Sequence, residues 1–192
     1  MKKIAIIGTG LTALSAAHHL PTSNITFFEK SWRAGGRIST RKHNNLQFDH
    51  GAHFLSTDHG VLGFTEALEK VKAIKKIEGL FTPNYLGKAS KEMKPIIIGN
   101  DGIQSIPLNL HKSLHYPTHF STKIEKIEKV KENYYLSSDK DQFGPFDMVF
   151  ACIPFEQGAE LLYDHIDFKN YSSLDFNSIW TVMLGFDKRL GT

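Results

Sequence analysis

Residues 3–13 read Lys-Ile-Ala-Ile-Ile-Gly-Thr-Gly-Leu-Thr-Ala, and this stretch decides the fold of the chain. Residues 3–7 form a short apolar run that is predicted to be a buried strand. Gly8 interrupts the run, and a helical pattern follows from Leu11 to Leu20. A second strand is predicted at Ile25–Phe28, and two strands joined by one helix form a parallel pair with a right-handed crossover.

The turn between the first strand and the helix has the pattern G-x-G-x-x-A, formed by Gly8, Gly10 and Ala13. Gly8 makes the tight turn, Gly10 lets a pyrophosphate approach the backbone, and Ala13 lets the helix pack close to the strand. The free N–H groups at the helix start favour phosphate. Glu29 ends the second strand, where a carboxylate can accept hydrogen bonds from both ribose hydroxyls and repel a 2′-phosphate. The spacing therefore predicts a site for a dinucleotide other than NADP.

A second glycine turn follows at residues 33–41, which read Arg-Ala-Gly-Gly-Arg-Ile-Ser-Thr-Arg. It offers further backbone donors and a guanidinium near a pyrophosphate, which a plain NAD domain does not need. Residues 31–44 as a whole are expected to form a loop, and residues 48–54 a tight backbone segment near the ligand. An NAD-dependent enzyme without flavin remains a weaker alternative, against which this second turn argues.

Taken in order along the chain, these segments resemble the flavin-containing amine oxidase superfamily, and most closely its renalase-like branch in bacteria. The matching segments are residues 4–13, 29–31, 35–38, 49–54, 102–106, 144–147, 151–154 and 180–186. The chain departs from the family at His53, where a glutamine is usual, and at Trp32, where an arginine is usual. The resemblance implies FAD as cofactor, a small-molecule substrate, and oxidation of a dihydronicotinamide-like compound or an amine, with reoxidation of the flavin by oxygen.

The resemblance also implies the residues that bind the cofactor. The pyrophosphate is expected to contact Gly8, Gly10, Thr12 and Ala13, and the adenosine ribose is expected to contact Glu29. Gly36 and Arg37 are expected to contact the pyrophosphate and the ribityl chain, and Gly51 and Ala52 to lie near the flavin. The backbone of Ile124 is expected to contact the adenine, and Ala151 to lie against the cofactor. Leu11 and Lys30 stand within matching segments and are counted with this set. No residue is assigned a catalytic role, and no metal site is expected.

The fold class expected from these patterns is α/β, with a Rossmann-like FAD-binding domain built from a parallel sheet and a β-meander, and a partial α+β substrate domain. The FAD-binding domain is predicted at residues 1–53 and 100–154, and the substrate domain at 54–99 and 155–192. Helices are expected at residues 58–71, about 102–112 and 155–163, and strands within 74–98 and at 146–153 and 180–186. A hairpin is expected at residues 121–138, although spacings of three between Ile124, Ile127 and Val130 leave a helix open.

The chain is expected to lack the C-terminal third of the family. Nothing in residues 155–192 resembles the late Gly-Asp segment that closes the FAD site of family members. Such a chain should expose a sheet edge and apolar surface, through which it can associate with itself or with a partner chain. A non-catalytic dinucleotide-binding fragment or module is therefore the alternative to an active flavin oxidoreductase.

Composition excludes several other classes of protein. The net charge is only +3, with 23 basic and 20 acidic residues scattered along the chain, so no nucleic-acid partner is expected. No apolar run approaches the roughly 20 residues that span a bilayer, so no membrane partner is expected. The single cysteine, Cys152, fits a reducing compartment, and the protein is expected in the cytoplasm. The cluster of His50, His53 and His59 matches no standard metal-ligand spacing.

Overall fold

The computed structural model describes residues 1–20, 24–56, 62–81, 84–85, 88–89, 92–168 and 176–186. Its centre is a four-stranded sheet in the order β10-β2-β1-β14, and each neighbouring pair is parallel. The strands are β1 (Lys3–Ile7), β2 (Asn24–Phe28), β10 (Thr118–His119) and β14 (Met148–Ala151). The predicted α/β fold with a parallel sheet and a Rossmann-like βαβ unit is confirmed.

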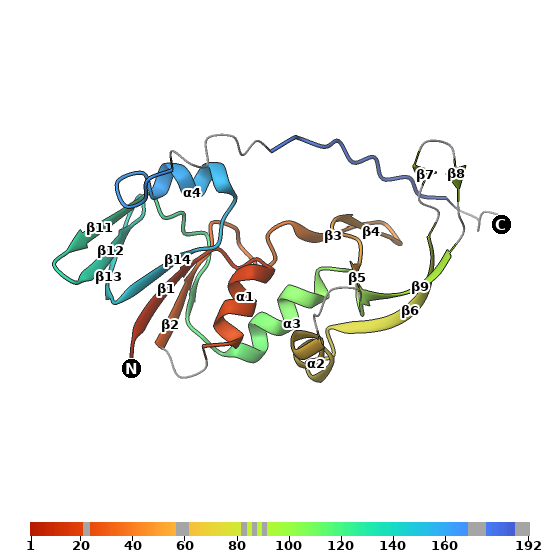
Figure 1. The fold of residues 1–192 in the computed structure, drawn as a ribbon, viewed down its shortest axis with the longest axis horizontal. Coiled ribbons are helices and arrows are strands. Elements are labelled where there is room, and N and C mark those ends of the chain that lie inside the picture. Colours follow the sequence, from red (N-terminus) through yellow and green to blue (C-terminus); the bar gives the residue numbers. More distant parts are fainter. Residues whose placement is uncertain are drawn as a thin grey trace.

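The two faces of the central strand β1 belong to two different cores. Ile4 and Ile6 pack with α1 and α3 on one face, whereas Ala5 and Ile7 pack against the other cluster of apolar residues. Because successive side chains of a strand point to opposite faces, one continuous apolar run serves both layers. The helices are α1 (Leu11–His18), α2 (Leu62–Lys70), α3 (Ser105–Leu114) and α4 (Phe155–Leu161). Figure 1 shows α1 beside α3, and these two helices are in contact.

A three-stranded antiparallel meander covers the second face of the sheet. It consists of β11 (Lys126–Val130), β12 (Asn133–Ser137) and β13 (Gln142–Phe146), in that order. Leu136 and Phe146 of the meander pack in the same cluster as Ile7. The strand interpretation of residues 126–130 is therefore confirmed over the helical one, although the strand begins later than predicted. The turn residue Lys131 has a positive φ of 55°.

The predicted loop at residues 31–44 is wrong over its second half. A hairpin forms there, with β3 (Ile38–His43) paired antiparallel to β4 (Leu46–Gly51). The sequence hides the first strand because Ile38 is its only large apolar residue, so no alternation is visible. The sequence does contain a turn residue between the two strands, which is Asn44. It adopts a positive φ of 52°, a conformation that asparagine tolerates well.

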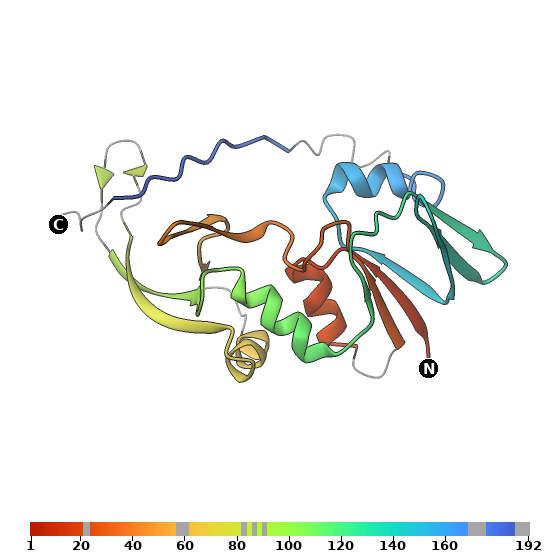
Figure 2. The ribbon, with the colours of Figure 1, turned by 180° about the vertical axis from the view of Figure 1, so that it is seen from behind.

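A second sheet lies at the other end of the molecule, in the order β5-β9-β6 (Figures 1 and 2). Its strands are β5 (Leu55–Ser56), β6 (Ile74–Phe81) and β9 (Glu92–Gly99), and the short strands β7 (Asn84–Tyr85) and β8 (Lys88–Ala89) pair beyond it. Strands were predicted in this region, as was the helix that precedes it. The start of that predicted helix lies outside the described residues. The proposed domain boundaries remain a prediction.

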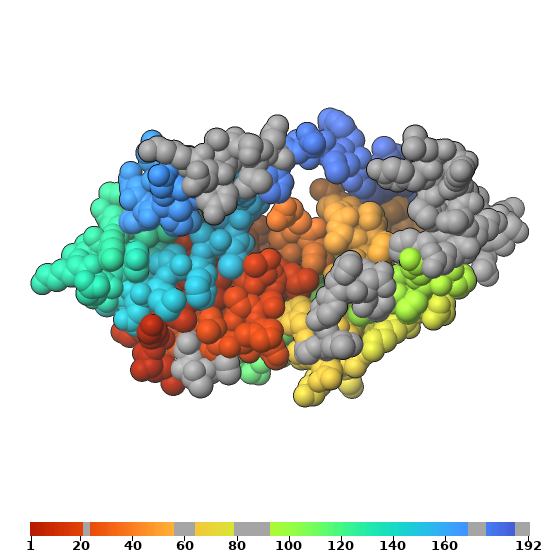
Figure 3. Space-filling view, viewed as in Figure 1, coloured from red at the N-terminus to blue at the C-terminus, as the bar shows by residue number. Residues whose placement is uncertain are grey.

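Residues 176–186 do not form the strand that was predicted at 180–186. The segment is extended but has no strand partner among the described residues, and it crosses from the α4 side toward β7 and β8 (Figures 1 and 2). Trp180 is 96% exposed. An apolar pattern becomes a strand only when a neighbour supplies hydrogen-bond partners, and none is in place here. In Figure 3 the segment passes above an opening in the surface of the molecule.

Candidate dinucleotide site

A cavity of about 990 Å³ opens where β1, β2 and β14 end. The carboxyl ends of parallel strands are the usual place for a ligand in an α/β sheet. The cavity is lined by residues 7–12, 28–31, 35–38, 122–125 and 152–154 and by Gln157, Glu160 and Leu161. The N-terminal strand, both glycine turns, the segment that leads into the meander and α4 therefore all contribute to one site.

Gly8 and Gly10 have different structural requirements. Gly8 has a φ of +97°, and a Cβ atom there would lie 2.7 Å from the carbonyl oxygen of Cys152, so a side chain is excluded. A Cβ atom on Gly10, in contrast, would meet no other atom within 4 Å. Gly10 is the N-cap of α1 and supplies no side-chain cap, so the first N–H groups of the helix have no acceptor in the part of the chain that the structure describes. Leu11 and Thr12 of this first turn line the cavity.

Glu29 is held at the end of β2 by three hydrogen bonds. Its Oε2 atom accepts from the backbone N–H of Thr9 at 2.9 Å and from the Thr9 hydroxyl at 2.6 Å. Its Oε1 atom accepts from the backbone N–H of Ser31 at 2.8 Å. A carboxylate has about four lone-pair positions, so these bonds orient the group and leave acceptor capacity toward the cavity. The Glu29 side chain is buried but lines the cavity.

The two glycine turns are in direct contact. The backbone N–H of Gly35 donates to the carbonyl of Thr9 at 3.2 Å. A Cβ atom on Gly36 would lie 3.4 Å from the Cα atom of Gly10. Arg37 follows in the cavity wall, is exposed, and forms no hydrogen bond or ion pair within the described part of the chain. Arg37 and the start of α1 therefore line the same cavity, and neither has an acceptor within the described residues.

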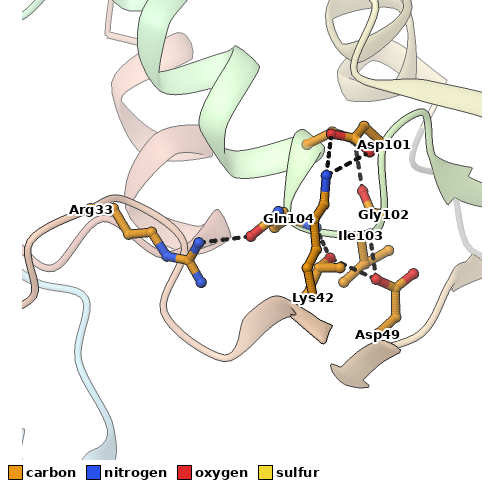
Figure 4. A network of polar contacts seen from close by, with 9 residues as sticks. Arg33, Lys42, Asp49, Asp101, Gly102, Ile103 and Gln104 are labelled. Carbon is orange, nitrogen blue, oxygen red and sulfur yellow. Dashed lines mark hydrogen bonds and ion pairs between the residues drawn. The ribbon is translucent and has the colours of Figure 1, made fainter. Parts of the chain in front are cut away.

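A polar network fixes the hairpin β3–β4 to the start of α3 (Figure 4). Oδ1 of Asp49 accepts from the Thr40 hydroxyl at 2.6 Å and from the backbone N–H of Ile103 at 3.0 Å. The Thr40 hydroxyl oxygen in turn accepts from the backbone N–H of Gln104 at 3.1 Å. Gln104 has no side-chain cap of its own, so the hairpin caps α3 from outside. Arg33 donates to Oε1 of Gln104 at 2.9 Å and ties the second glycine turn to the same network.

Nine of the thirteen residues expected to bind the cofactor line the cavity: Gly8, Gly10, Leu11, Thr12, Glu29, Lys30, Gly36, Arg37 and Ile124. The Ile124 side chain is buried in the core, which leaves its backbone for the cavity. The other four are Ala13, Gly51, Ala52 and Ala151, and they lie outside the lining. Ala13 is buried in the core beneath the glycine turn.

Gly51 and Ala151 have structural positions of their own. Gly51 has a φ of +84°, and a Cβ atom there would overlap the carbonyl oxygen of Arg37. The glycine therefore lets the backbones of the hairpin and the second glycine turn approach each other. Ala151 pairs with Ile7 as the last residue of β14, one position before Cys152, which does line the cavity.

Sequence reasoning missed Thr9, Gln157 and Glu160 as residues of the site. Thr9 occupies a variable position of the glycine pattern, so only the structure reveals its bond to Glu29. Gln157 and Glu160 are three residues apart on α4, and that spacing places them on one helix face. Gln157 accepts a hydrogen bond from Lys30 at 3.1 Å, which joins α4 to the end of β2.

The titratable groups give little sign of acid–base chemistry. Burial raises the pKa of the Cys152 thiol, which keeps this thiol protonated and poorly nucleophilic. Burial lowers the pKa of His111, which lies on α3 and does not line the cavity. Within the described residues, no group of three or more His, Cys, Asp or Glu side chains could hold a metal ion. No described helix combines the length and the apolar character that a membrane crossing requires.

Comparisons with known proteins agree with this architecture. Residues 6–65 match the family described as NAD(P)-binding Rossmann-like domain. A 65-residue part of the chain is 34% identical to the mitochondrial protoporphyrinogen oxidase of Nicotiana tabacum, and the match covers 33% of this chain and 13% of that enzyme. The matched segment contains at most about a third of the chain, so it establishes the dinucleotide-binding unit and not the family of the whole protein.

Two solved structures share the fold over most of the chain. One is assigned as a protoporphyrinogen oxidase from Exiguobacterium sp. 255-15, with a TM-score of 0.65, 15% identity, and coverage of 85% of this chain and 62% of the other. The second is putrescine oxidase bound to putrescine, with a TM-score of 0.63, 10% identity, and coverage of 81% and 59%. At such identities the likeness shows the fold alone. The chain spans about three fifths of the length of these proteins.

Proposed function

We propose that the large cavity binds the ADP half of FAD and that the protein is a flavin-dependent oxidoreductase. The observation that carries the proposal is the contact between two glycine turns, with Arg37 in the wall of the same cavity and unpaired among the described residues. One turn offers the acceptor-free start of α1, and the other offers a guanidinium, which together suit a pyrophosphate. A single glycine turn would suffice for a simpler nucleotide.

The residues of this chain bind and orient in this proposal. The α1 start and Arg37 hold the pyrophosphate, Glu29 accepts a hydrogen bond from the adenosine ribose, and the backbone at Ile124 contacts the adenine. FAD, when bound, supplies the redox chemistry, which is acceptance of a hydride from the substrate and reoxidation by oxygen. No catalytic side chain is assigned, because the described titratable groups of the cavity have no arrangement that requires one.

The proposed substrate is a small molecule of the dihydronicotinamide or amine type, as in the renalase-like branch of the flavin-containing amine oxidases. The resemblance of the sequence segments supports the branch and, with it, this class of substrate. We place the protein in a reducing compartment such as the cytoplasm, with the single cysteine in support.

The decisive experiment is retention of flavin by the purified chain. The protein is incubated with FAD or with FMN, desalted, and examined for visible flavin absorption. FAD should be retained and FMN should not, because FMN lacks the ADP half that the cavity binds. Binding of ADP and NAD but not of FAD would instead indicate a dinucleotide site without flavin. Loss of all of these ligands would overturn the proposal.

A non-catalytic dinucleotide-binding module is the second candidate. The observation in its favour is that the chain spans 62% and 59% of the two solved proteins that share its fold. Peroxide production by the FAD-loaded chain, screened with amines and dihydronicotinamides, separates the candidates. Turnover would exclude the module, and tight FAD binding without turnover on any substrate would favour it.

Association of this chain with a second copy or a partner chain is a further part of the proposal. Ile179, Trp180 and Val182 are each at least 80% exposed in the extended segment 176–186. Contiguous exposed apolar side chains of this kind favour contact with another surface. Sedimentation velocity over a range of concentrations would detect self-association, and a single monomeric species throughout would exclude it.

A further inference from the structure

A second cavity, of about 450 Å³, lies against the second glycine turn. It shares Lys30, Ser31, Gly35, Gly36 and Ile38 with the large cavity. The residues that belong to this second cavity alone are Trp32, Arg33, Ala34, Ser39, Gln104 and Ser121. None of these six residues is among the thirteen expected to bind the cofactor, although Arg33, Ala34 and Ser39 belong to the second glycine turn, and Lys30 and Gly36 line both cavities.

Among the described residues, the lining of the second cavity contains two cations and no carboxylate. Arg33 is half-buried and donates to neutral acceptors, which are Oε1 of Gln104 at 2.9 Å and the Ser39 hydroxyl at 3.5 Å. Lys30 donates to the neutral Gln157 side chain. Within the described chain neither cation forms an ion pair. Lys30 is exposed, but the charge of Arg33 is partly buried without a counter-ion, which is costly, and an anion in the cavity would offset that cost.

The guanidinium of Arg33 has donors to spare. It carries five N–H bonds in a fixed plane, and its two hydrogen bonds, to Gln104 and Ser39, use one N–H on each terminal nitrogen. Gln104 holds the group in place (Figure 4). The backbone N–H of Gln104 is itself fixed by its hydrogen bond to the Thr40 hydroxyl. A guanidinium whose orientation is fixed in this way is prepared for a carboxylate or a phosphate, which it can bind through two parallel hydrogen bonds.

Trp32 adds an aromatic surface beside this cation. Its side chain is 74% exposed, and the Cζ atom of Arg33 lies 4.9 Å from the centre of the Trp32 ring. A tryptophan side chain that is exposed at a cavity leaves a large apolar area in water, which is unusual. A flat ring that stacked on Trp32 would cover this area and would bring an attached anionic group to Arg33.

We propose that the second cavity is a subsite for an organic anion, namely a carboxylate or phosphate carried on a flat ring. Arg33 anchors the anionic group, Lys30 adds a second positive charge, and Trp32 stacks on the ring. The assignment depends only on residues of the second cavity, so it stands whether or not the large cavity holds FAD.

The test uses Trp32 fluorescence. The chain has two tryptophans, so the substitution Trp180→Phe leaves Trp32 as the only one. The probes are 4-nitrobenzoate and 4-nitrophenyl phosphate, which quench tryptophan on contact, and 4-nitrobenzamide, which has the same ring without the charge. We expect saturable quenching by at least one anion and only linear, collisional quenching by the amide. The anion that binds with the higher affinity shows whether the subsite prefers a carboxylate or a phosphate.

Substitutions of single charged residues show which side chain binds the anion. Arg33→Met should weaken binding of the preferred anion at least tenfold, Arg33→Lys should restore part of the affinity, and Arg41→Met, at an exposed arginine of β3, should leave it unchanged. Saturating ADP should not displace the anion, because ADP occupies the large cavity. Added salt should weaken the anion's binding.

Circular dichroism checks that each variant is folded. If Arg33→Met is unfolded, Lys30→Met and the salt series take its place, with the same expected direction. Equal affinity in a folded Arg33→Met variant, saturable quenching by the neutral amide, displacement of the anion by ADP, or no saturable quenching by either anion would each overturn the proposal. Retention of FAD is measured separately, so the anion-binding result can be interpreted even if the chain does not retain FAD.

Discussion

The side-chain hydroxyl of Thr9 lies 2.6 Å from Oε2 of Glu29, and both side chains are buried. The backbone N–H of Thr9 donates to the same oxygen at 2.9 Å. The first glycine turn and the end of β2 are therefore joined by hydrogen bonds to a charged group, which are stronger than bonds between neutral groups. The bond also determines which face of the carboxylate is presented to the cavity.

Replacement of Thr9 by valine should lower both stability and nucleotide affinity. The variant keeps the shape and the backbone bond but loses the hydroxyl donor to Glu29, and a hydrogen bond to a charged group contributes about 1.5–3 kcal/mol. Urea unfolding measures the stability, and Thr9→Ser, which retains the hydroxyl, is the matched control.

The same variant tests whether Thr9 acts through Glu29. Titration with ADP and with 2′-deoxy-ADP should show a larger loss for ADP in Thr9→Val, because only ADP presents the 2′-hydroxyl to the carboxylate. An equal loss for both nucleotides would mean that Thr9 has only a structural role.

Alanine at Gly8 and alanine at Gly10 should give opposite phenotypes. Gly8→Ala introduces a Cβ atom at a φ of +97° and against the Cys152 carbonyl, so it should destabilise folding by more than about 1 kcal/mol. Gly10→Ala meets open space at an ordinary φ of −72°, so folding should be nearly unaffected. Its methyl group instead faces the proposed pyrophosphate position, and FAD affinity should fall. Thermal unfolding and FAD titration of both variants would show whether these effects separate.

Asp49→Ala should destabilise the protein through the start of α3. The substitution removes the acceptor for the Ile103 N–H and for the Thr40 hydroxyl, and loss of such a cap costs about 0.5–2 kcal/mol. Asp139→Ala is a matched control, because Asp139 lies at an exposed position that makes only a marginal contact with Lys140. Chemical denaturation compares the two, and equal midpoints would contradict the capping role.

Cys152 should react slowly with iodoacetamide in the folded protein. Burial raises the pKa of its thiol, so little thiolate is present near pH 8, whereas the thiol of the urea-unfolded chain ionises normally. Because Cys152 lines the large cavity, saturating ADP should slow the reaction further. Mass spectrometry of timed samples gives the rates. Reaction as fast as in the unfolded chain would show that the thiol is accessible.

The same pKa shift has a consequence for stability. Above the ordinary thiol pKa the folded state retains a proton that the unfolded state has lost, so this group's contribution to stability declines as the pH rises through that range. The decline should be smaller in Cys152→Ala, and denaturation midpoints between pH 8 and pH 10 would measure the difference.

The local parts of the site could be predicted from the sequence because their signals are close together. Gly8, Gly10 and Glu29 belong to one βαβ unit, and each has a steric or electrostatic reason to be the residue it is. The meander could be predicted as well, since Tyr134 and Leu136 follow a short turn with a strand-like pattern.

The parts that could not be predicted depend on contacts between distant residues. The bond from Asp49 to Ile103 spans 54 positions, and the bond from Arg33 to Gln104 spans 71, so neither leaves a local pattern. The polar strand Ile38–His43 shows no alternation because its stability comes from its partner β4. The strand predicted around Trp180 was wrong for the opposite reason, since the sequence there has a strand pattern but the segment has no partner strand among the described residues.

The pairing of β1 with β14 sets the order in which the molecule can be completed on the ribosome. Ile4 is among the first residues made, yet its partner Met148 follows only after most of the chain has been translated. During this interval one edge of the central strand has no neighbour, and an open apolar edge invites aggregation. Cys152 and α4, which close the large cavity, emerge later still. Nascent chains shorter than about 150 residues should therefore depend on chaperones and be unable to capture a ligand.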